Sequence, residues 1–280
     1  MALTKVLVTV KTYPTLSDKY DELVCTAGLR EDGSWIRIYP VPFRKLDYQN
    51  RYQKWHWIEL DLVKNKSDFR PESYKPYSID SEIKILEKID TTDQWIRRKE
   101  IALRNVQTNL SELIKEAKDK QKATSLAIVK PKEVLDFICE PCDKEWNPQK
   151  IAKIIANQAQ GSLFDVEETK SIFKVVKKIP YKFSYVFTTE DQIVRKLMIE
   201  DWELGALYWN CLKDAEGDEK ITCQKVKEKY LDYMYYKRDL YFFMGTTFKF
   251  HNVSPNPFLI IGAFYPPKED TKKIIQPQLF

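Results

Sequence analysis

The chain has 280 residues, of which 43% are hydrophobic and 31% charged, and its formal net charge is +5. This composition excludes a disordered polymer, and the absence of any apolar run near ~18 residues argues against a membrane-spanning helix. We expect a cytoplasmic protein with no membrane partner, because the short apolar start lacks the cleavage pattern of a signal peptide. The mild positive charge permits nucleic-acid binding without requiring it.

Residues 1–90 are predicted to form one half of a small β-barrel. Alternating apolar and polar side chains predict strands in LTKVLVTVKT and KWHWIELDLVK, and SEIKILEKI adds another. Two apolar runs flank Arg-Glu-Asp-Gly, where Gly33 can supply the positive φ of a tight hairpin. Closing these short strands into a barrel would remove their exposed edges.

Helices and strands are mixed in the rest of the chain. Residues 91–157 are predicted to be a helical and mixed insert, with two helices that break near Thr108 and Asn109. Residues 158–170 are predicted to be a flexible linker, and residues 171–280 an α+β part that closes the barrel or forms a second domain. The predicted fold is α+β, with a small barrel built from N- and C-terminal strands around a central helical insert.

The linker contains QGSLF, which resembles the peptide that docks many DNA replication and repair proteins on the bacterial sliding clamp. In that resemblance Leu163 and Phe164 would fill an apolar pocket, and Gln160 would bond backbone at its rim. A weaker copy ends the chain, with Gln276, Leu279 and Phe280 in the corresponding places. The alternative is that these side chains pack against the core of the protein itself.

Basic and aromatic residues are interleaved between positions 35 and 57, as a nucleic-acid surface requires. Because Ile36 and Ile38 share one face of their strand, the residues that alternate with them are expected on an exposed face. A helix near residue 100 adds two arginines spaced seven apart, hence on one side. The alternative for both groups is an aromatic core with solvated cations. The predicted nucleic-acid contacts are Trp35, Arg37, Tyr39, Arg44, Lys45, Arg97 and Arg104.

Two metal sites are weaker alternatives. Four of the five cysteines could form a thiolate zinc site, although a cytoplasmic location favours reduced thiols. The zinc candidates are Cys139, Cys142, Cys211 and Cys223. An acidic pair followed by Glu-x-Lys suggests instead a metal-dependent nuclease that would use Asp61, Asp80, Glu82 and Lys84.

Other catalytic patterns are scarce. The chain has only two His and no phosphate-binding Gly-rich loop, so we expect no cofactor and favour a protein without catalytic activity. Asp201 and Glu203 stand at the start of a predicted helix, where capping and the helix dipole explain them.

Three segments resemble a little-characterised family of bacterial proteins over most of the chain: CTAGLREDGSWIRIYPVPFR, IEDWELGALYWNC and DLYFFMGTTFKFHNVSPNPFLIIGAFYPP. The opening hairpin and closing strands are also similar in style to small PUA-like barrels, a group that includes readers of RNA and of modified bases in DNA. This similarity implies a PUA-like or OB-like barrel that binds nucleic acid, with DNA favoured. A base or modification reader in repair or phage defence is the preferred hypothesis. A metal-dependent nuclease and a protein-binding accessory subunit are the alternatives.

Overall fold

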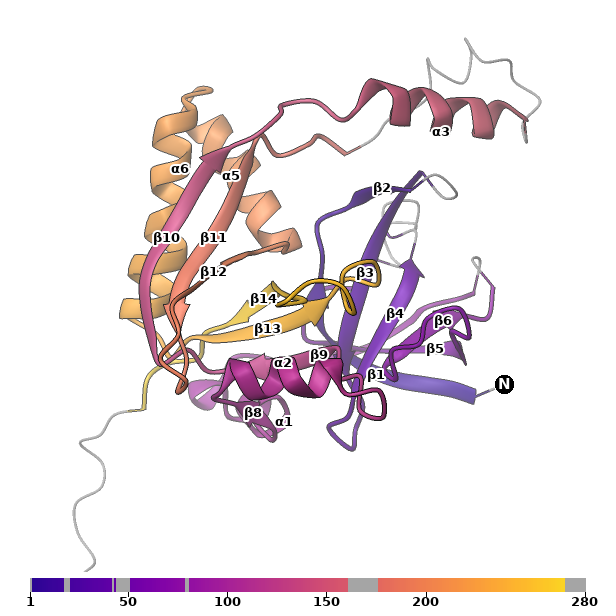
Figure 1. Cartoon of the computed structure of the whole chain (residues 1–280), viewed down its shortest axis with the longest axis horizontal. Coiled ribbons are helices and arrows are strands. Elements are labelled where there is room, and N and C mark those ends of the chain that lie inside the picture. Colours follow the sequence, from indigo (N-terminus) through magenta and orange to yellow (C-terminus); the bar gives the residue numbers. More distant parts are fainter. Residues whose placement is uncertain are drawn as a thin grey trace, which may run out of the picture.

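A computed structural model describes residues 2–17, 21–41, 43, 51–78, 81–160 and 176–269. Figure 1 shows a barrel on one side of the molecule and long strands with covering helices on the other. The predicted α+β class with a small barrel is confirmed. Within the described ranges, no helix has both the length and the apolar character needed to cross a membrane.

Five strands near the N-terminus close the barrel without help from the rest of the chain. The strand order β1-β3-β4-β6-β5 returns to its start because β1 also pairs with β5. Gly33, at φ 84°, makes the turn between β3 and β4 as predicted. The barrel strands are β1 (Ala2–Lys11), β3 (Asp21–Leu29), β4 (Trp35–Val41), β5 (His56–Lys64) and β6 (Ser73–Pro76). At the margins, β2 (Thr15–Ser17) pairs with β3 and β7 (Lys84–Lys88) with β5.

The expectation that C-terminal strands complete the barrel is wrong. They form a separate four-stranded sheet of order β14-β13-β9-β8, because the β1–β5 pairing leaves them no barrel edge. The sheet packs on the barrel through a shared core that includes Leu7, Trp55, Phe243 and Phe264. Its strands are β8 (Val106–Gln107), β9 (Leu126–Val129), β13 (Tyr241–Thr246) and β14 (Phe258–Phe264).

A third sheet of antiparallel strands carries helices on one face (Figure 1). Its core is aromatic, with Phe137 stacked on Tyr230 at 5.3 Å between ring centroids. The strands are β10 (Glu133–Pro141), β11 (Tyr181–Thr188) and β12 (Arg195–Met198). The covering helices are α5 (Trp202–Asp214), α6 (Glu219–Lys227) and the π-helical η4 (Glu228–Tyr236).

The remaining helices agree with the sequence pattern, except that the helix of Pro148–Gln160 extends into the start of the predicted linker of residues 158–170. The predicted break near Thr108 is confirmed, because β8 separates two helices and Asn109 caps the second by accepting a bond from the Glu112 amide. Such a cap satisfies an amide at the helix start that has no partner within the helix. These helices are η3 (Asp93–Trp95), α1 (Ile96–Ala102), α2 (Leu110–Lys118) and α3 (Pro148–Gln160).

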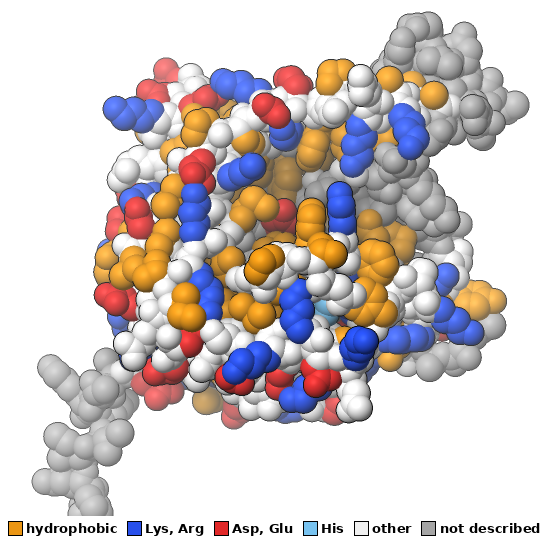
Figure 2. Space-filling view, viewed as in Figure 1, with side chains coloured by type: hydrophobic (Ala, Val, Ile, Leu, Met, Phe, Trp, Pro, Cys, Tyr) orange, Lys and Arg blue, Asp and Glu red, His pale blue; other side chains and the backbone are white. Residues whose placement is uncertain are grey.

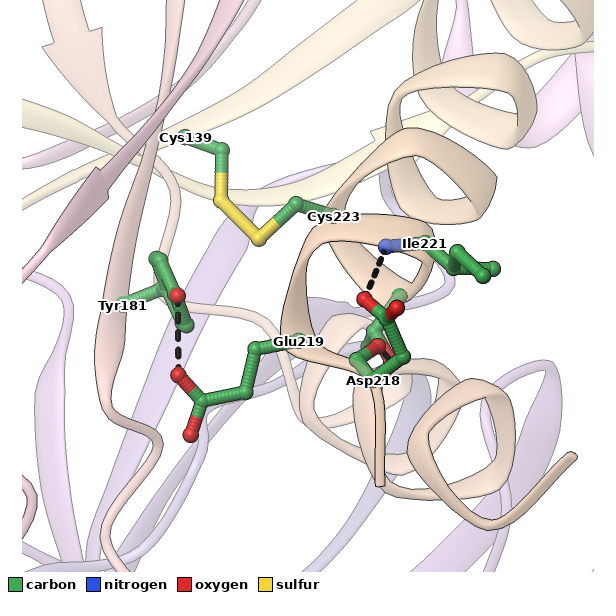
Figure 3. Close-up of a disulfide and its surroundings, with 7 residues drawn as sticks. Cys139, Tyr181, Asp218, Glu219, Ile221 and Cys223 are labelled. Atoms are coloured by element: carbon green, nitrogen blue, oxygen red, sulfur yellow. Dashed lines mark hydrogen bonds between the residues drawn. A yellow bond between two sulfur atoms is a disulfide. The ribbon is translucent and has the colours of Figure 1, made fainter. Parts of the chain in front are cut away.

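A disulfide joins Cys139 on β10 to Cys223 on α6, with Cα atoms 6.3 Å apart (Figure 3). The expectation of five reduced thiols is therefore wrong for these two, and the predicted four-thiolate zinc site is not formed. Cys142 and Cys211 remain free thiols. Beside the disulfide, the Tyr181 hydroxyl donates to Glu219 at 2.9 Å, and Lys227 of α6 pairs with Asp136 of β10 at 2.7 Å, so three contacts of different kinds hold α6 against the sheet.

Asp191 ties the turn between β11 and β12 to the start of α2. Its carboxylate accepts from Arg195 at 2.7 Å and from the Ser111 hydroxyl at 2.6 Å. These hydrogen bonds, with that of Arg195 the largest influence, hold the pKa of Asp191 far below its ordinary value.

We expect Asp191→Asn to lower the free energy of unfolding by about 1.5–3 kcal/mol at neutral pH, because the charged acceptor is lost. A carboxyl with a lowered folded-state pKa contributes stability above its unfolded pKa of ~3.9 and loses it as the pH falls toward the folded value. Urea unfolding at pH 7, 5 and 3 should therefore show the gap between wild type and variant shrinking in acid. Asp214→Asn, an exposed change, is the control, and a gap constant with pH would contradict the prediction.

Candidate functional site

A cavity of about 380 Å³ lies where the barrel meets the C-terminal sheets and helices. Figure 2 shows one face of the molecule, on which hydrophobic side chains gather in the central part among basic and acidic ones. We call the space the tryptophan cavity, because three tryptophan rings line it. The side chains that matter to its chemistry are Lys11, Trp55, Trp95, Arg98, Trp202 and Glu203.

The tryptophans are held by other rings and by unusual backbone. Trp55 packs on Phe264 at 5.0 Å between centroids, and Trp95 packs on the same ring at 5.9 Å. Both tryptophans have left-handed backbone, with φ of 70° and 64°. Such conformations are costly for bulky residues and cluster at functional sites. Trp202, the first residue of α5, packs edge-on against Phe43 at 5.3 Å.

Arg98 brings a buried positive charge to the cavity wall. Its guanidinium lies 4.7 Å from the Trp55 ring centroid and 5.1 Å from that of Trp95. Two of its N–H groups donate to the Ile89 carbonyl, at 3.0 and 2.6 Å. No carboxylate within the described ranges forms an ion pair with it, so its charge is available to an anionic ligand.

Lys11 ends β1 with its ammonium between two rings, 4.1 Å from the centroid of Phe43 and 4.7 Å from that of Trp202. The residue is 7% exposed and has no hydrogen-bond acceptor in the described part of the chain. Burial lowers the pKa of the amine to about 8, and the charge of Lys54 acts in the same direction.

Lys54 joins the two sides of the cavity. Its ammonium donates to both carboxylate oxygens of Asp201, at 2.7 and 2.8 Å, and to Glu203 at 3.1 Å. Asp201 also accepts from the Glu203 amide, so the predicted capping role is confirmed. Burial raises the pKa of Asp201 to about 6, against the opposing attraction of Lys54. Four basic side chains and one acidic side chain line the cavity, which gives it a positive field.

Two of the predicted nucleic-acid contacts, Arg37 and Tyr39, line a second cavity of about 380 Å³, and none of the predicted contacts within the described ranges lines the tryptophan cavity. Arg37 is only 3% exposed, so its expected place on an exposed face is wrong. Trp35 packs edge-on against Phe243 at 5.8 Å, and Tyr39 is 38% exposed. Arg44 and Lys45 lie outside the described residues.

The two predicted helix arginines also lie away from the cavity. Arg97 is exposed and pairs with Glu87 at 3.4 Å, and Arg104 donates to the Glu31 carbonyl. Their neighbour Arg98 is the cation of α1 that reaches the cavity. Arg97 and Arg104 therefore share a helical region with the cavity residue Arg98 but do not line the cavity themselves.

The nuclease and docking candidates find no site in the described residues. Lys84 pairs with Glu59 at 3.9 Å, and neither Asp61 nor Glu82 belongs to a group of three potential metal ligands in the described ranges. Asp80 lies outside those ranges. The docking residues also lie outside the described ranges: they are Leu163, Phe164, Gln276, Leu279 and Phe280. Gln160 is the last residue of α3, and its side chain is not described.

Two family models together span the chain. Residues 2–104 match a domain of unknown function, DUF8758, and residues 106–279, more than half of the chain, match a second, DUF8757. The chain belongs to the DUF8757 family. No curated protein matches its sequence. The two matches meet between α1 and β8, and the tryptophan cavity takes Lys11 and Arg98 from the first and Trp202 from the DUF8757 region.

Little in the sequence marks the cavity in advance. Trp55, Trp95 and Trp202 are far apart in the chain, and only the docking of the DUF8757 region on the barrel gathers them. The one local signal is the IEDWEL segment, where capping residues flank a large aromatic side chain at the start of a helix.

Proposed function

We propose that this protein binds nucleic acid, DNA in preference, and holds an unstacked base in the tryptophan cavity. The observation that supports the proposal is the combination of three tryptophan rings with a basic lining in one cavity of about 380 Å³. Aromatic faces stack bases of any sequence, and arginine and lysine neutralise phosphates. The volume falls in the usual range for small-ligand pockets.

A base extruded into the cavity would place its phosphate near Arg98 and the exposed Lys88 at the cavity wall. This arrangement suits a reader of bases or base modifications in repair or phage defence. The QGSLF segment would then recruit the protein to the bacterial sliding clamp. A closed barrel of PUA-like or OB-like character agrees with this proposal, since such barrels bind nucleic acids.

Fluorescence anisotropy with labelled single-stranded DNA, duplex DNA and RNA over a salt series tests the proposal. We expect Trp95→Ala to weaken binding by about 5-fold to 150-fold, because loss of one stacking ring costs about 1–3 kcal/mol. Lys88→Ala should reduce the slope of log affinity against log salt by about 0.7 for a single strand.

Matched controls separate the cavity from the rest of the surface. Trp146→Ala removes a half-buried tryptophan that bonds to the Val176 carbonyl, and Arg97→Ala removes an exposed cation of α1. Both should leave affinity within about twofold, since neither residue lines the cavity. No binding of any nucleic acid at ~50 mM salt would overturn the proposal.

A further inference from the structure

Lys11 differs from the other cations of the tryptophan cavity because no hydrogen bond or ion pair holds its charge within the described residues. Lys54 is bonded to two carboxylates, Lys88 donates to Gln53 at 2.7 Å, and Arg98 is fixed on the Ile89 carbonyl. In the part of the chain that the structure describes, the Lys11 ammonium contacts two ring faces, and the residue is 7% exposed. Phosphate binding explains Lys88 and Arg98 better than it explains Lys11, and the two carboxylates already account for Lys54.

An amine in this setting is activated as a nucleophile. Desolvation and a neighbouring cation both favour the neutral amine, and these are the two devices by which proteins make lysines that attack carbonyl groups. Lys54, Lys88 and Arg98 are the cations lining the same cavity, while Glu203 and the buried Asp201 oppose them. The balance still lowers the pKa of Lys11 to about 8, so a useful fraction of the amine is neutral near neutral pH.

We propose that Lys11 forms an imine with an aldehyde or ketone that also carries a phosphate group. Arg98 and Lys88 would hold the phosphate, and the tryptophan rings would cover the apolar part of the ligand. Glu203, 52% exposed at its side chain and bonded to Lys54 through one oxygen, lies in the cavity as a proton acceptor and donor. The cavity thus supplies a nucleophile, an anion site and a proton relay.

The reaction balances without any further reagent. The neutral amine adds to the carbonyl carbon, and one of its two protons passes to the carbonyl oxygen to give a carbinolamine. Glu203 then takes the second proton from nitrogen and passes it to the hydroxyl group, which leaves as water as the C=N bond forms. One water is released for each imine, and nothing is oxidised or reduced.

Two sources could supply this chemistry. One is the sugar aldehyde at a site in a DNA strand that has lost its base, where phosphates flank the reactive carbon. The other is a small phosphorylated aldehyde. The inference concerns the same cavity as the proposed function but does not require that nucleic acid binds there.

Trapping with borohydride tests the inference. The full chain is incubated with pyridoxal 5′-phosphate, a ring-bearing aldehyde with a phosphate, then reduced, digested and mapped by mass spectrometry. We expect Lys11 to be labelled at least tenfold faster than Lys5, which also lies on β1 over a tryptophan ring but pairs with Glu31 at 2.8 Å. The rate should rise between pH 7 and 9, as Lys11 loses its proton near pH 8. Pyridoxal without phosphate should react at least tenfold more slowly, and inorganic phosphate should compete.

Variants and a second probe complete the test. Lys11→Met and Lys11→Arg should both abolish the fast label, and the second keeps the charge if the first fails to fold. Lys5→Met should not change it. An oligonucleotide with an abasic site should become cross-linked on reduction if the natural aldehyde is in DNA, whereas labelling by pyridoxal phosphate alone points to a small molecule. If Lys11 is labelled no faster than Lys5, the inference is overturned, even if the protein binds DNA. If Lys11 is labelled fast but the protein binds no DNA, only the proposed function is refuted.

Discussion

Lys54→Met is expected to lower the free energy of unfolding by about 3–5 kcal/mol, the usual cost of removing one partner from a buried ion pair. Asp201 is 2% exposed at its side chain, and Lys54 satisfies both of its carboxylate oxygens. Without the lysine, the carboxylate is left charged and unpaired in the interior, or must take up a proton. Urea unfolding followed by tryptophan fluorescence measures the loss.

The second partner and an exposed pair provide the controls. Adding Asp201→Asn to Lys54→Met should recover part of the stability, because Asn removes the stranded charge and still caps α5. Lys84→Met breaks an exposed contact with Glu59, with the lysine side chain 66% exposed, and should cost no more than about 1 kcal/mol. If Lys54→Met lowers the free energy of unfolding by no more than Lys84→Met does, the Lys54–Asp201 ion pair does not stabilise the contact between the barrel and the DUF8757 region.

The Lys54–Asp201 pair matters to the site because it joins the two matched regions. Lys54 belongs to the barrel region and Asp201 to the DUF8757 region, and each is next to a cavity tryptophan in the chain, Trp55 and Trp202. This ion pair is one of several contacts that dock the two regions, and its position beside both tryptophans means that it helps to set the distance between the cavity walls. Loss of the pair should disturb ligand binding and stability together, so binding must be measured on the folded fraction.

Local patterns predicted much of the secondary structure. Alternation placed β1 and β5, and Gly33 placed the hairpin between β3 and β4, because a two-residue period and a positive φ are properties of short segments. Pairing between distant strands leaves no such mark. The apolar strands β13 and β14 showed that a sheet would form, but which edge they would join depended on the closure of β1 onto β5.

The site was less predictable for a related reason. Alternation correctly put Ile36 and Ile38 in the barrel core, and it implied that Arg37 faced water. In the folded chain a second layer, the sheet of β9 and β13, covers that face. A sequence pattern shows which residues share a face, but not what later covers it.

Arg37→Met is therefore expected to destabilise the protein, by about 3 kcal/mol, rather than to weaken nucleic-acid binding directly. The guanidinium donates to the Ser125 hydroxyl at 2.7 Å and to the Ser125 carbonyl at 3.1 Å, and it reaches the Thr246 carbonyl at 3.4 Å. Ser125, which has no exposed surface, in turn donates to Glu72 at 2.7 Å, and this chain of bonds balances the buried charge. Removing the arginine leaves several buried acceptors without donors.

Two further arginine variants show whether the hydrogen bonds of Arg37 cause the loss of stability in Arg37→Met. Arg37→Lys cannot reproduce the forked geometry and should recover less than half of the loss, whereas Arg104→Met, at an exposed residue, should change stability by no more than about 0.5 kcal/mol. Hydrogen exchange should show faster opening of β9 and β13 in Arg37→Met, since Arg37 bonds at the junction with both strands. If the variant keeps its stability and loses affinity for DNA, Arg37 is a contact residue that a ligand reaches through the second cavity, which Arg37 lines with Tyr39.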